Sequence, residues 1–275
     1  MNLPVHAIAI LGLTALLVVL IVLRARPKRY PAKPAADIGK CMTIGHREVQ
    51  EDNCAAEVTD AGILAVLADG MGKRYGGRVA SRIAVQIFSD LFLDYNAFDN
   101  PQYYFRKAFH AANRQILETV DEQRGSASVA AAMIRSGKLY YALAGDVRIA
   151  VFHRGDLVPV SEGHTVDVLA QREFRRGRLT RQDAVAMLER HRLYNYVGQD
   201  GFRDIEFFDT PLTLDAQDTV VLMSDGVYGC LAWREIEEVL EGKGSCQDKA
   251  LEIIQRINRC PVEDKDNASI LLVRP

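Results

Sequence analysis

The sequence predicts a layered α+β domain preceded by one membrane-spanning helix. Three features of the chain support this prediction. An uncharged apolar run lies near the N-terminus, short apolar segments of strand length recur through the rest of the chain, and two pairs of longer segments carry apolar residues at helical spacing. Groups of strands that alternate with helix pairs favour a domain built of packed layers.

Composition limits the classes of function that the chain can serve. Of its 275 residues, 48% are hydrophobic and 25% are charged, as in an ordinary globular protein. The 34 Lys and Arg residues against 36 Asp and Glu give a net charge of -2, without the basic excess of a nucleic-acid-binding surface. The five cysteines are scattered and form no C-x-x-C pair, which argues against a zinc knuckle or a disulfide framework.

The N-terminal apolar run has the properties of a membrane anchor. Residues Ala7–Leu23 carry no charge, and extension back through Val5 and Leu3 brings the run close to the roughly 20 residues that cross a bilayer. Basic residues follow it at 24–29 and none precedes it, whereas a signal peptide has the opposite arrangement. The positive-inside rule therefore predicts a single-pass protein of the cytoplasmic (inner) membrane, with the domain in the cytoplasm. The alternatives are an atypical signal peptide and a buried core helix.

Three regions follow from this interpretation. Residues 1–24 form the transmembrane anchor, and residues 25–40 form a basic, Pro-rich tether that holds the domain away from the bilayer. Residues 41–275 form the folded domain.

The first half of the domain is predicted to contain three strands and a helix pair. The run at 62–68, GILAVLA, suits a buried strand, and Asp-Gly-Met-Gly at 69–72 predicts a tight turn after it. One helix is expected from Gly77 to about Leu93. The second begins near Pro101, since proline is favoured in the first turn of a helix. The two earlier strands are expected at 41–47 and 53–58.

The second half is predicted to contain a meander, an insertion and a second helix pair. A polar, helical segment at 165–195 is expected to lie over a surface. Strands are expected at 127–134, 138–144, 147–153, 205–212, 219–224 and 268–273, and helices at 232–240 and 246–258.

Acidic residues stand at the ends of several predicted strands. Asp52 follows a polar run, Asp69 follows LAVLA, Asp225 follows VVLMS, and Asp266 precedes NASILLV. Converging carboxylates would repel one another unless a hard cation lay between them. Oxygen ligands without a His or Cys cluster favour Mg²⁺ or Mn²⁺ over zinc. Two such ions, about 3.5–4 Å apart, can hold a phosphoryl group and activate a water molecule.

Each acidic motif also has a simpler interpretation. An Asp-Gly pair is more often only a turn, and residues 264–267 could form a hairpin loop. The joint pattern is more specific than its parts. In chain order the motifs are Arg47-x-x-x-Glu51-Asp52-Asn53, Ala68-Asp69-Gly70-Met71-Gly72, Gly76-Gly77, Gly125-Ser126-Ala127-Ser128, Gly145-Asp146-Val147-Arg148, Ser224-Asp225-Gly226 and Asp266-Asn267-Ala268-Ser269.

This series resembles the metal-dependent protein phosphatases of the protein phosphatase 2C (PPM) family, in particular the bacterial branch, from about residue 41 to the C-terminus. The resemblance implies a four-layer αββα sandwich of two antiparallel sheets flanked by helix pairs. It implies a serine/threonine phosphoprotein phosphatase in which a water activated by two metal ions attacks phosphorus in line, without a phosphoenzyme. The cofactors would be two core Mn²⁺ or Mg²⁺ ions, with a possible third. The partners would be phosphorylated proteins and a cognate Ser/Thr kinase with its substrates.

The resemblance also implies the metal ligands. Asp69 would bridge the two core ions, and the Gly70 carbonyl would be a further ligand. Asp225 and Asp266 would complete the shell. Asp146, together with Asp225, would bind a weaker third ion.

Three further residues would act on water and substrate. Glu51 and Asp52 would orient metal-bound waters through hydrogen bonds. Arg47 would bind the substrate phosphate, since its planar guanidinium matches phosphate oxygens.

The chain departs from the family pattern around the site rim and the flap at roughly 161–198. Lys73-Arg74 replace a frequent Gly-His, Val147 replaces a Ser, and His164 is a weak candidate for a site role. These changes leave the substrate open. A non-catalytic module that binds phosphoproteins or metals, and a hydrolase of small phosphorylated metabolites, remain the alternative functions.

Overall fold

The computed structural model describes residues 36–94, 96–120, 125–188 and 192–275. The predicted membrane span lies outside these residues, as does most of the predicted tether. Among the residues that are described, no helix is both long enough and apolar enough to span a bilayer.

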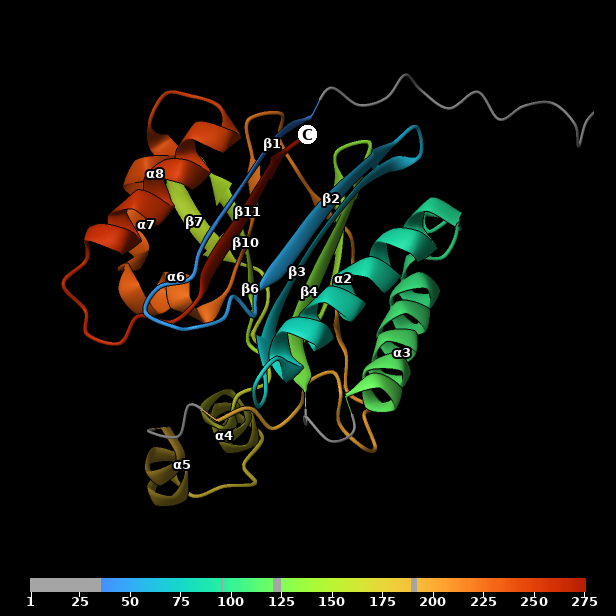
Figure 1. Cartoon of the computed structure of the whole chain (residues 1–275), viewed down its shortest axis with the longest axis vertical. Coiled ribbons are helices and arrows are strands. Elements are labelled where there is room, and N and C mark those ends of the chain that lie inside the picture. The colour runs from blue at the N-terminus through green and yellow to red at the C-terminus, as the bar shows by residue number, and fades with distance from the viewer. Residues whose placement is uncertain (1–35, 95, 121–124, 189–191) are drawn as a thin grey trace, which may run out of the picture. The chain divides into compact units, whose positions relative to one another are not determined.

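Two antiparallel sheets form the centre of the domain (Figure 1). The first sheet has the order β1 (Asp37–Thr43), β11 (Ala268–Arg274), β10 (Thr219–Met223), β6 (Arg148–His153) and β7 (Asp156–Pro159). The second has the order β2 (Asn53–Thr59), β3 (Gly62–Met71), β4 (Ser126–Arg135), β5 (Lys138–Ala144) and β8 (Glu206–Phe207), with β9 (Leu212–Thr213) also paired to β5.

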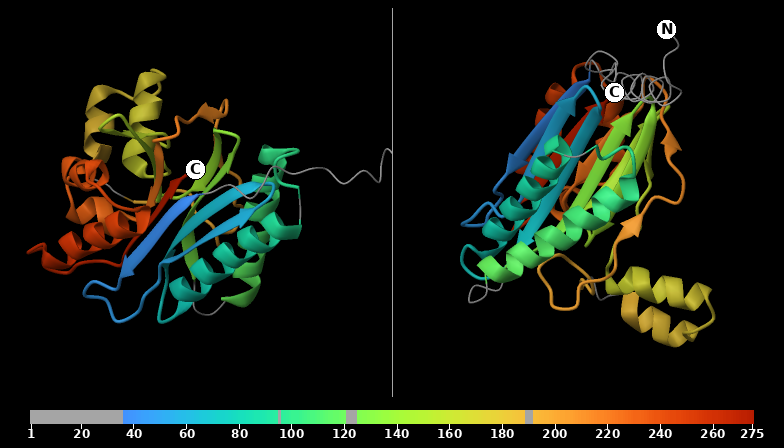
Figure 2. Two further views of the ribbon diagram at one scale, coloured as in Figure 1. Left: turned by 90° about the horizontal axis from the view of Figure 1, so that it is seen from above. Right: turned by 90° about the vertical axis from the view of Figure 1, so that its right-hand side faces the viewer.

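A helix pair covers the outer face of each sheet, as the views in Figure 2 show. Helices α2 (Gly76–Asp94) and α3 (Pro101–Thr119) pack on the second sheet, and α7 (Trp233–Glu241) and α8 (Cys246–Arg259) pack on the first. The predicted layered α+β domain and the αββα arrangement implied by the resemblance are thereby confirmed. Two short helices, α4 (Val166–Arg175) and α5 (Arg181–Leu188), form a pair at one end of the sandwich (Figure 1).

Side chains that alternate between the two faces of each strand form three separate core layers. On β3, Leu64 and Val66 face the helices α2 and α3, whereas Ile63 and Leu67 face the first sheet. Residues of β11 divide in the same way between the inter-sheet core and the core beneath α7 and α8. Each sheet is therefore buried on both faces and is held rigidly at its ends.

Several elements differ from the prediction for identifiable reasons. The tight turn predicted at 69–72 is wrong, because β3 continues to Met71 and its last three residues pair with β4. Strand β1 begins at Asp37, ahead of the expected 41–47, because its whole length pairs with β11 and Asp37 forms an ion pair with Arg274. The strand expected at 205–212 is instead the two short strands β8 and β9, and neither β7 nor α6 (Asp225–Cys230) was predicted.

Candidate metal centre

The core between the two sheets becomes polar at one end. Along β3 the residues that face the first sheet are Ile63, Ala65 and Leu67, and the next residue on this face is Asp69. The same change occurs on the neighbouring strands. Polar residues continue the inter-sheet face at Asp52 before β2, Ser128 on β4, Ser224 after β10 and Ser269 on β11, and all four are buried.

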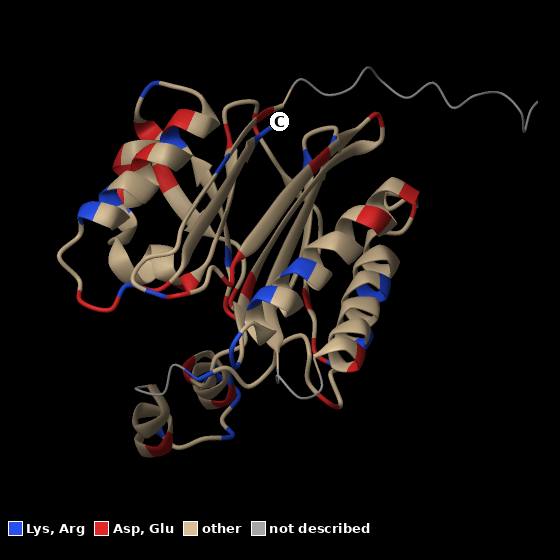
Figure 3. Cartoon of the chain, in the orientation of Figure 1, with Lys and Arg blue, Asp and Glu red and all other residues tan. Residues whose placement is uncertain are grey.

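Acidic residues from separate parts of the chain meet at this polar end, where red segments gather at the ends of the sheets in Figure 3. They surround a cavity of about 590 Å³. Asp69 comes from β3, Asp146 from the turn between β5 and β6, and Asp225 from the first residue of α6. Asp266 and Glu51 complete the acidic lining, and the backbone of Gly70 also contributes. The structure therefore brings together all five predicted metal ligands.

Burial and mutual repulsion raise the pKa of Asp69 and of Asp225, so these two carboxyl groups ionise only above their ordinary pH range. Burial, reinforced by the charges of Asp52, Asp225 and Asp146, raises the pKa of Asp69 well above its ordinary value. Burial also raises the pKa of Asp52 and that of Asp225 to about 6. Each of the cavity-lining carboxylates keeps part of its surface open to the cavity. A cation placed there would remove the repulsion that now opposes ionisation.

The donor set fits a hard divalent cation. Oxygen atoms of carboxylates and one backbone carbonyl line the cavity, which is the ligand chemistry of Mn²⁺ and Mg²⁺. Two buried oxygens, Glu51 Oε1 and Asp52 Oδ1, have no hydrogen-bond partner within the part of the chain that the structure describes. Buried polar atoms are rarely left unpaired, so these two oxygens require water or an ion.

Glu51 and Asp52 are held by different contacts. The Ser224 hydroxyl donates a 2.9 Å hydrogen bond to Asp52 Oδ2, so Asp52 lies against the inter-sheet core. Burial raises the pKa of Glu51, while hydrogen bonds from the backbone N–H groups of Gly77 and Arg78 oppose this shift. The backbone N–H of Glu51 donates to Asn267 Oδ1 at 2.7 Å. The N-terminus of α2 and the loop before β11 therefore position these two acids.

Arg47 and Asp266 form a bidentate pair at the mouth of the cavity. Arg47 Nε donates to Asp266 Oδ1 at 2.9 Å, and Nη2 donates to Oδ2 at 2.8 Å. Both residues line the cavity. For Asp266 to bind a cation and Arg47 to bind a phosphate, however, this pair has to open.

Asp146 is fixed by its neighbours. The Ser128 hydroxyl donates to Asp146 Oδ1 at 2.7 Å, and the Tyr228 hydroxyl donates to the Asp146 carbonyl at 3.1 Å. His164 Nδ1 accepts a hydrogen bond from the Gly145 N–H at 3.1 Å, and burial lowers the His164 pKa to about 4. His164 is therefore neutral and supports the turn that carries Asp146, rather than lining the cavity.

Some residues of the site were not singled out from the sequence. Ser128, Ser224 and Asn267 orient the acids, and the motifs that contain them were the available signal. Arg192, Leu193 and Tyr196, from the segment after α5, also line the cavity. Nothing in the sequence distinguished these three residues from the rest of the polar insertion.

The raised pKa values predict how stability depends on pH when a chelator removes divalent ions. Because the pKa of Asp52 and of Asp225 is about 6, above the ordinary 3.8, the folded state binds more protons than the unfolded state between these values. The free energy of unfolding should therefore fall as pH rises from about 4 to about 6. We expect the melting temperature in EDTA to be a few degrees higher at about pH 5 than at about pH 7.5.

With added Mn²⁺ the melting temperature should instead be higher at about pH 7.5 than at about pH 5, because protons compete with the cation for the same oxygens. In EDTA, the difference in melting temperature between the two pH values should be smaller in the Asp225→Asn variant, which lacks one of the two carboxyl groups with a raised pKa. A melting temperature in EDTA that rises steadily over this pH range would contradict the electrostatic description of the site.

Comparison with known proteins agrees with this geometry. The family profile described as Protein phosphatase 2C matches residues 42–251. The serine/threonine phosphatase stp of Listeria welshimeri is 29% identical over 236 residues, which cover 82% of this chain and 90% of the relative. The S. agalactiae serine/threonine phosphatase has a similar structure, with a TM-score of 0.75 at 24% identity over 86% of this chain and 98% of that one. The catalytic domain of the phosphatase PstP in complex with two manganese ions gives a TM-score of 0.66 at 21% identity, over 87% and 97% of the two chains.

Proposed function

Because the chain belongs to the protein phosphatase 2C family, we propose that it is a metal-dependent phosphatase of phosphoserine and phosphothreonine in proteins. The observation that carries this proposal is the group of buried carboxylates around one cavity, with a guanidinium at its mouth. Carboxylates bind the cofactor Mn²⁺ or Mg²⁺, and the guanidinium suits a phosphate.

The acids of the metal centre divide into metal ligands and groups that act on water. Asp69, Asp225, Asp266 and the Gly70 carbonyl would hold the two core ions. When bound, these ions neutralise the phosphoryl charge and make water a stronger nucleophile. Glu51 and Asp52 accept hydrogen bonds from water through their unpaired oxygens and so orient it for attack in line with the leaving oxygen.

Arg47 and Asp146 complete the set. Once released from Asp266, the Arg47 guanidinium binds two phosphate oxygens of the substrate with the same planar geometry. Asp146 lies beside Asp225 and is held by Ser128, which suits it to a third, more weakly bound ion.

Hydrolysis of phosphate esters by the full chain tests this function. We expect release of inorganic phosphate from an aryl phosphate and from a phosphothreonine peptide, both dependent on Mn²⁺ and both abolished by EDTA. A non-catalytic phosphoprotein-binding module would bind the peptide and release no phosphate. A hydrolase of small metabolites would act on the aryl phosphate and leave peptides and phosphoproteins intact. Either result would contradict the proposal.

We further propose that the N-terminal segment anchors this activity at a membrane. The uncharged run Ala7–Leu23 and the basic residues at 24–29 support a single-pass anchor with the phosphatase domain in the cytoplasm. Its substrates would then be cytoplasmic phosphoproteins, including those of a Ser/Thr kinase.

A topology experiment tests the anchor. In a bacterial host, we expect the full chain in the membrane fraction, and a reporter fused after Pro275 should be active only as a cytoplasmic protein. Replacing the basic residues at 24–29 by Gln should weaken this orientation, whereas the same replacement at the distant pair Arg234 and Lys243 should not. A periplasmic or secreted reporter would refute the orientation.

A further inference from the structure

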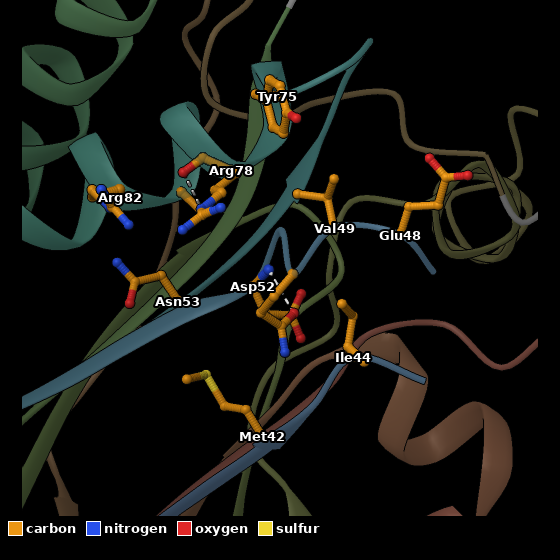
Figure 4. A pocket seen from close by; sticks show the side chains of 11 residues that line it. Met42, Ile44, Glu48, Val49, Asp52, Asn53, Tyr75, Arg78 and Arg82 are labelled. Carbon is orange, nitrogen blue, oxygen red and sulfur yellow. Dashed lines mark hydrogen bonds between the residues drawn. The ribbon is translucent and has the colours of Figure 1, made fainter. Parts of the chain in front are cut away.

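A second cavity, also of about 590 Å³, lies next to the metal centre (Figure 4). One wall is the start of α2, and the other is the chain between β1 and β2. Asp52 lines this groove, while the preceding residue, Glu51, lines the metal-centre cavity. Neighbouring residues of one segment therefore line both cavities, so the groove lies beside the metal centre.

The α2 wall of the groove is cationic. Arg78 and Arg82 lie one helical turn apart, are both exposed, and line the groove. Neither side chain has an ion-pair partner among the residues that the structure describes. Lys73 and Arg74 precede them, and the first turn of α2 contains no acid. In Figure 3, blue segments interrupt the tan ribbon in the first half of α2, and red appears only toward its other end.

This charge pattern does not serve the stability of the helix. Basic side chains near a helix N-terminus oppose the helix dipole, and like charges at i and i+4 repel each other. An anionic ligand would reverse both effects. The unpaired arginines are thus better explained by a binding role than by a folding role.

The opposite wall is partly apolar. On this wall Met42 and Ile44 each expose 41% of their surface, and Tyr75, just before α2 on the cationic wall, exposes 58%. Glu48 also lines the groove, on the side away from the two arginines in Figure 4. Asp52, which also lines the groove, is buried, and its Oδ2 accepts a hydrogen bond from the Ser224 hydroxyl. A hollow with apolar contacts on one side and cations on the other suits an extended peptide better than a flat membrane surface.

We propose that this groove binds the segment of the substrate protein that flanks the phosphorylated residue, and that Arg78 and Arg82 select acidic side chains in that segment. The inference rests on the proposed phosphatase function and adds a substrate class to it. Charge complementarity identifies the partner: a peptide with Glu or Asp near the phosphorylated residue would pair with both guanidinium groups while its phosphate lies in the metal centre.

Two phosphothreonine peptides that differ only in their flanking residues test this selectivity. One carries Glu on both sides of the phosphothreonine, and the other carries Gln. For the full chain reconstituted in neutral phosphatidylcholine vesicles, we expect KM to be about three- to tenfold lower for the Glu peptide, which corresponds to two exposed charge pairs. This advantage should decrease with added salt, while kcat stays the same for both peptides.

The Arg78→Ala/Arg82→Ala variant should lose this preference and keep its activity on an aryl phosphate, which is too small to reach the groove. The matched control Arg234→Ala/Lys243→Ala removes two exposed charges, one from α7 on the other sheet and one from the loop after it, and should keep the preference. An unchanged KM ratio in the Arg78→Ala/Arg82→Ala variant would overturn the proposal. So would an effect seen only when the vesicles contain anionic phosphatidylserine, which would assign the arginines to a membrane surface. Failure of the unaltered protein to hydrolyse the aryl phosphate would instead refute the phosphatase function.

Discussion

The Asp225→Asn variant is expected to hydrolyse an aryl phosphate at least about 100-fold more slowly than the unaltered protein at the same Mn²⁺ concentration. Asp225 begins α6 directly after β10 and faces Asp69 and Asp146 across the cavity. The amide keeps the shape of the side chain and removes its charge, so the loss reports on cation binding and not on packing.

The same variant should respond less to metal. Without divalent ions its melting temperature should equal or exceed that of the unaltered protein, because one buried like charge has been removed. The increase produced by Mn²⁺ should be smaller, since stabilisation by a ligand follows its affinity for the folded state. Asp156→Asn, at an exposed position in the β6–β7 hairpin, is the matched control and should change neither quantity. Full activity of the Asp225→Asn variant would remove Asp225 from the metal shell.

Gly70→Ala should produce a large loss of stability. Strand β3 passes α2 so closely here that a Cβ on residue 70 would lie 2.2 Å from the Gly77 carbonyl oxygen and 2.5 Å from that of Glu51. Both atoms belong to the backbone, so a whole element has to move. We expect a decrease in the free energy of unfolding of about 3 kcal/mol or more. Activity should fall as well, because the shift carries Asp69 with it.

Gly229→Ala provides the comparison for this substitution. Gly229 lies in α6, and a Cβ there would meet no atom within 4 Å. The melting temperature of the Gly229→Ala variant should stay the same or rise slightly, because alanine is the better helix former. A Gly70→Ala variant as stable and active as Gly229→Ala would show that β3 and α2 are not in such close contact.

Much of the site could be predicted from the sequence because its acids belong to motifs that follow one another in a characteristic order, several of them at strand ends. In the structure, alternation along β3 from Ile63 through Ala65 and Leu67 then places Asp69 on the inter-sheet face. The tight turn predicted at 69–72 was wrong because Asp-Gly is a strong local turn signal, and pairing with β4 overrides it here. Tertiary pairing likewise decides where β1 begins.

Other features depend on contacts between distant segments and had no sequence signal. The pairing of Arg47 with Asp266 joins residues that are 219 positions apart. His164 supports the turn that carries Asp146 through a hydrogen bond with the Gly145 N–H. Neither the alternation of apolar residues nor the spacing of motifs in the sequence reveals this contact. The groove beside the centre arises only when α2 packs next to the β1–β2 connection.

The number of Mn²⁺ ions bound by the full chain tests the central claim most directly. That claim is that the acids at the polar end of the inter-sheet core form a two-cation centre. A calorimetric titration at about pH 7.5 should show two tightly bound ions, with any third ion weaker and lost in Asp146→Ala. In Asp69→Asn, which lacks the carboxylate proposed to bridge the pair, both tight binding events should disappear while the protein remains folded. Two tight ions bound equally by the unaltered protein and by Asp69→Asn would contradict the account.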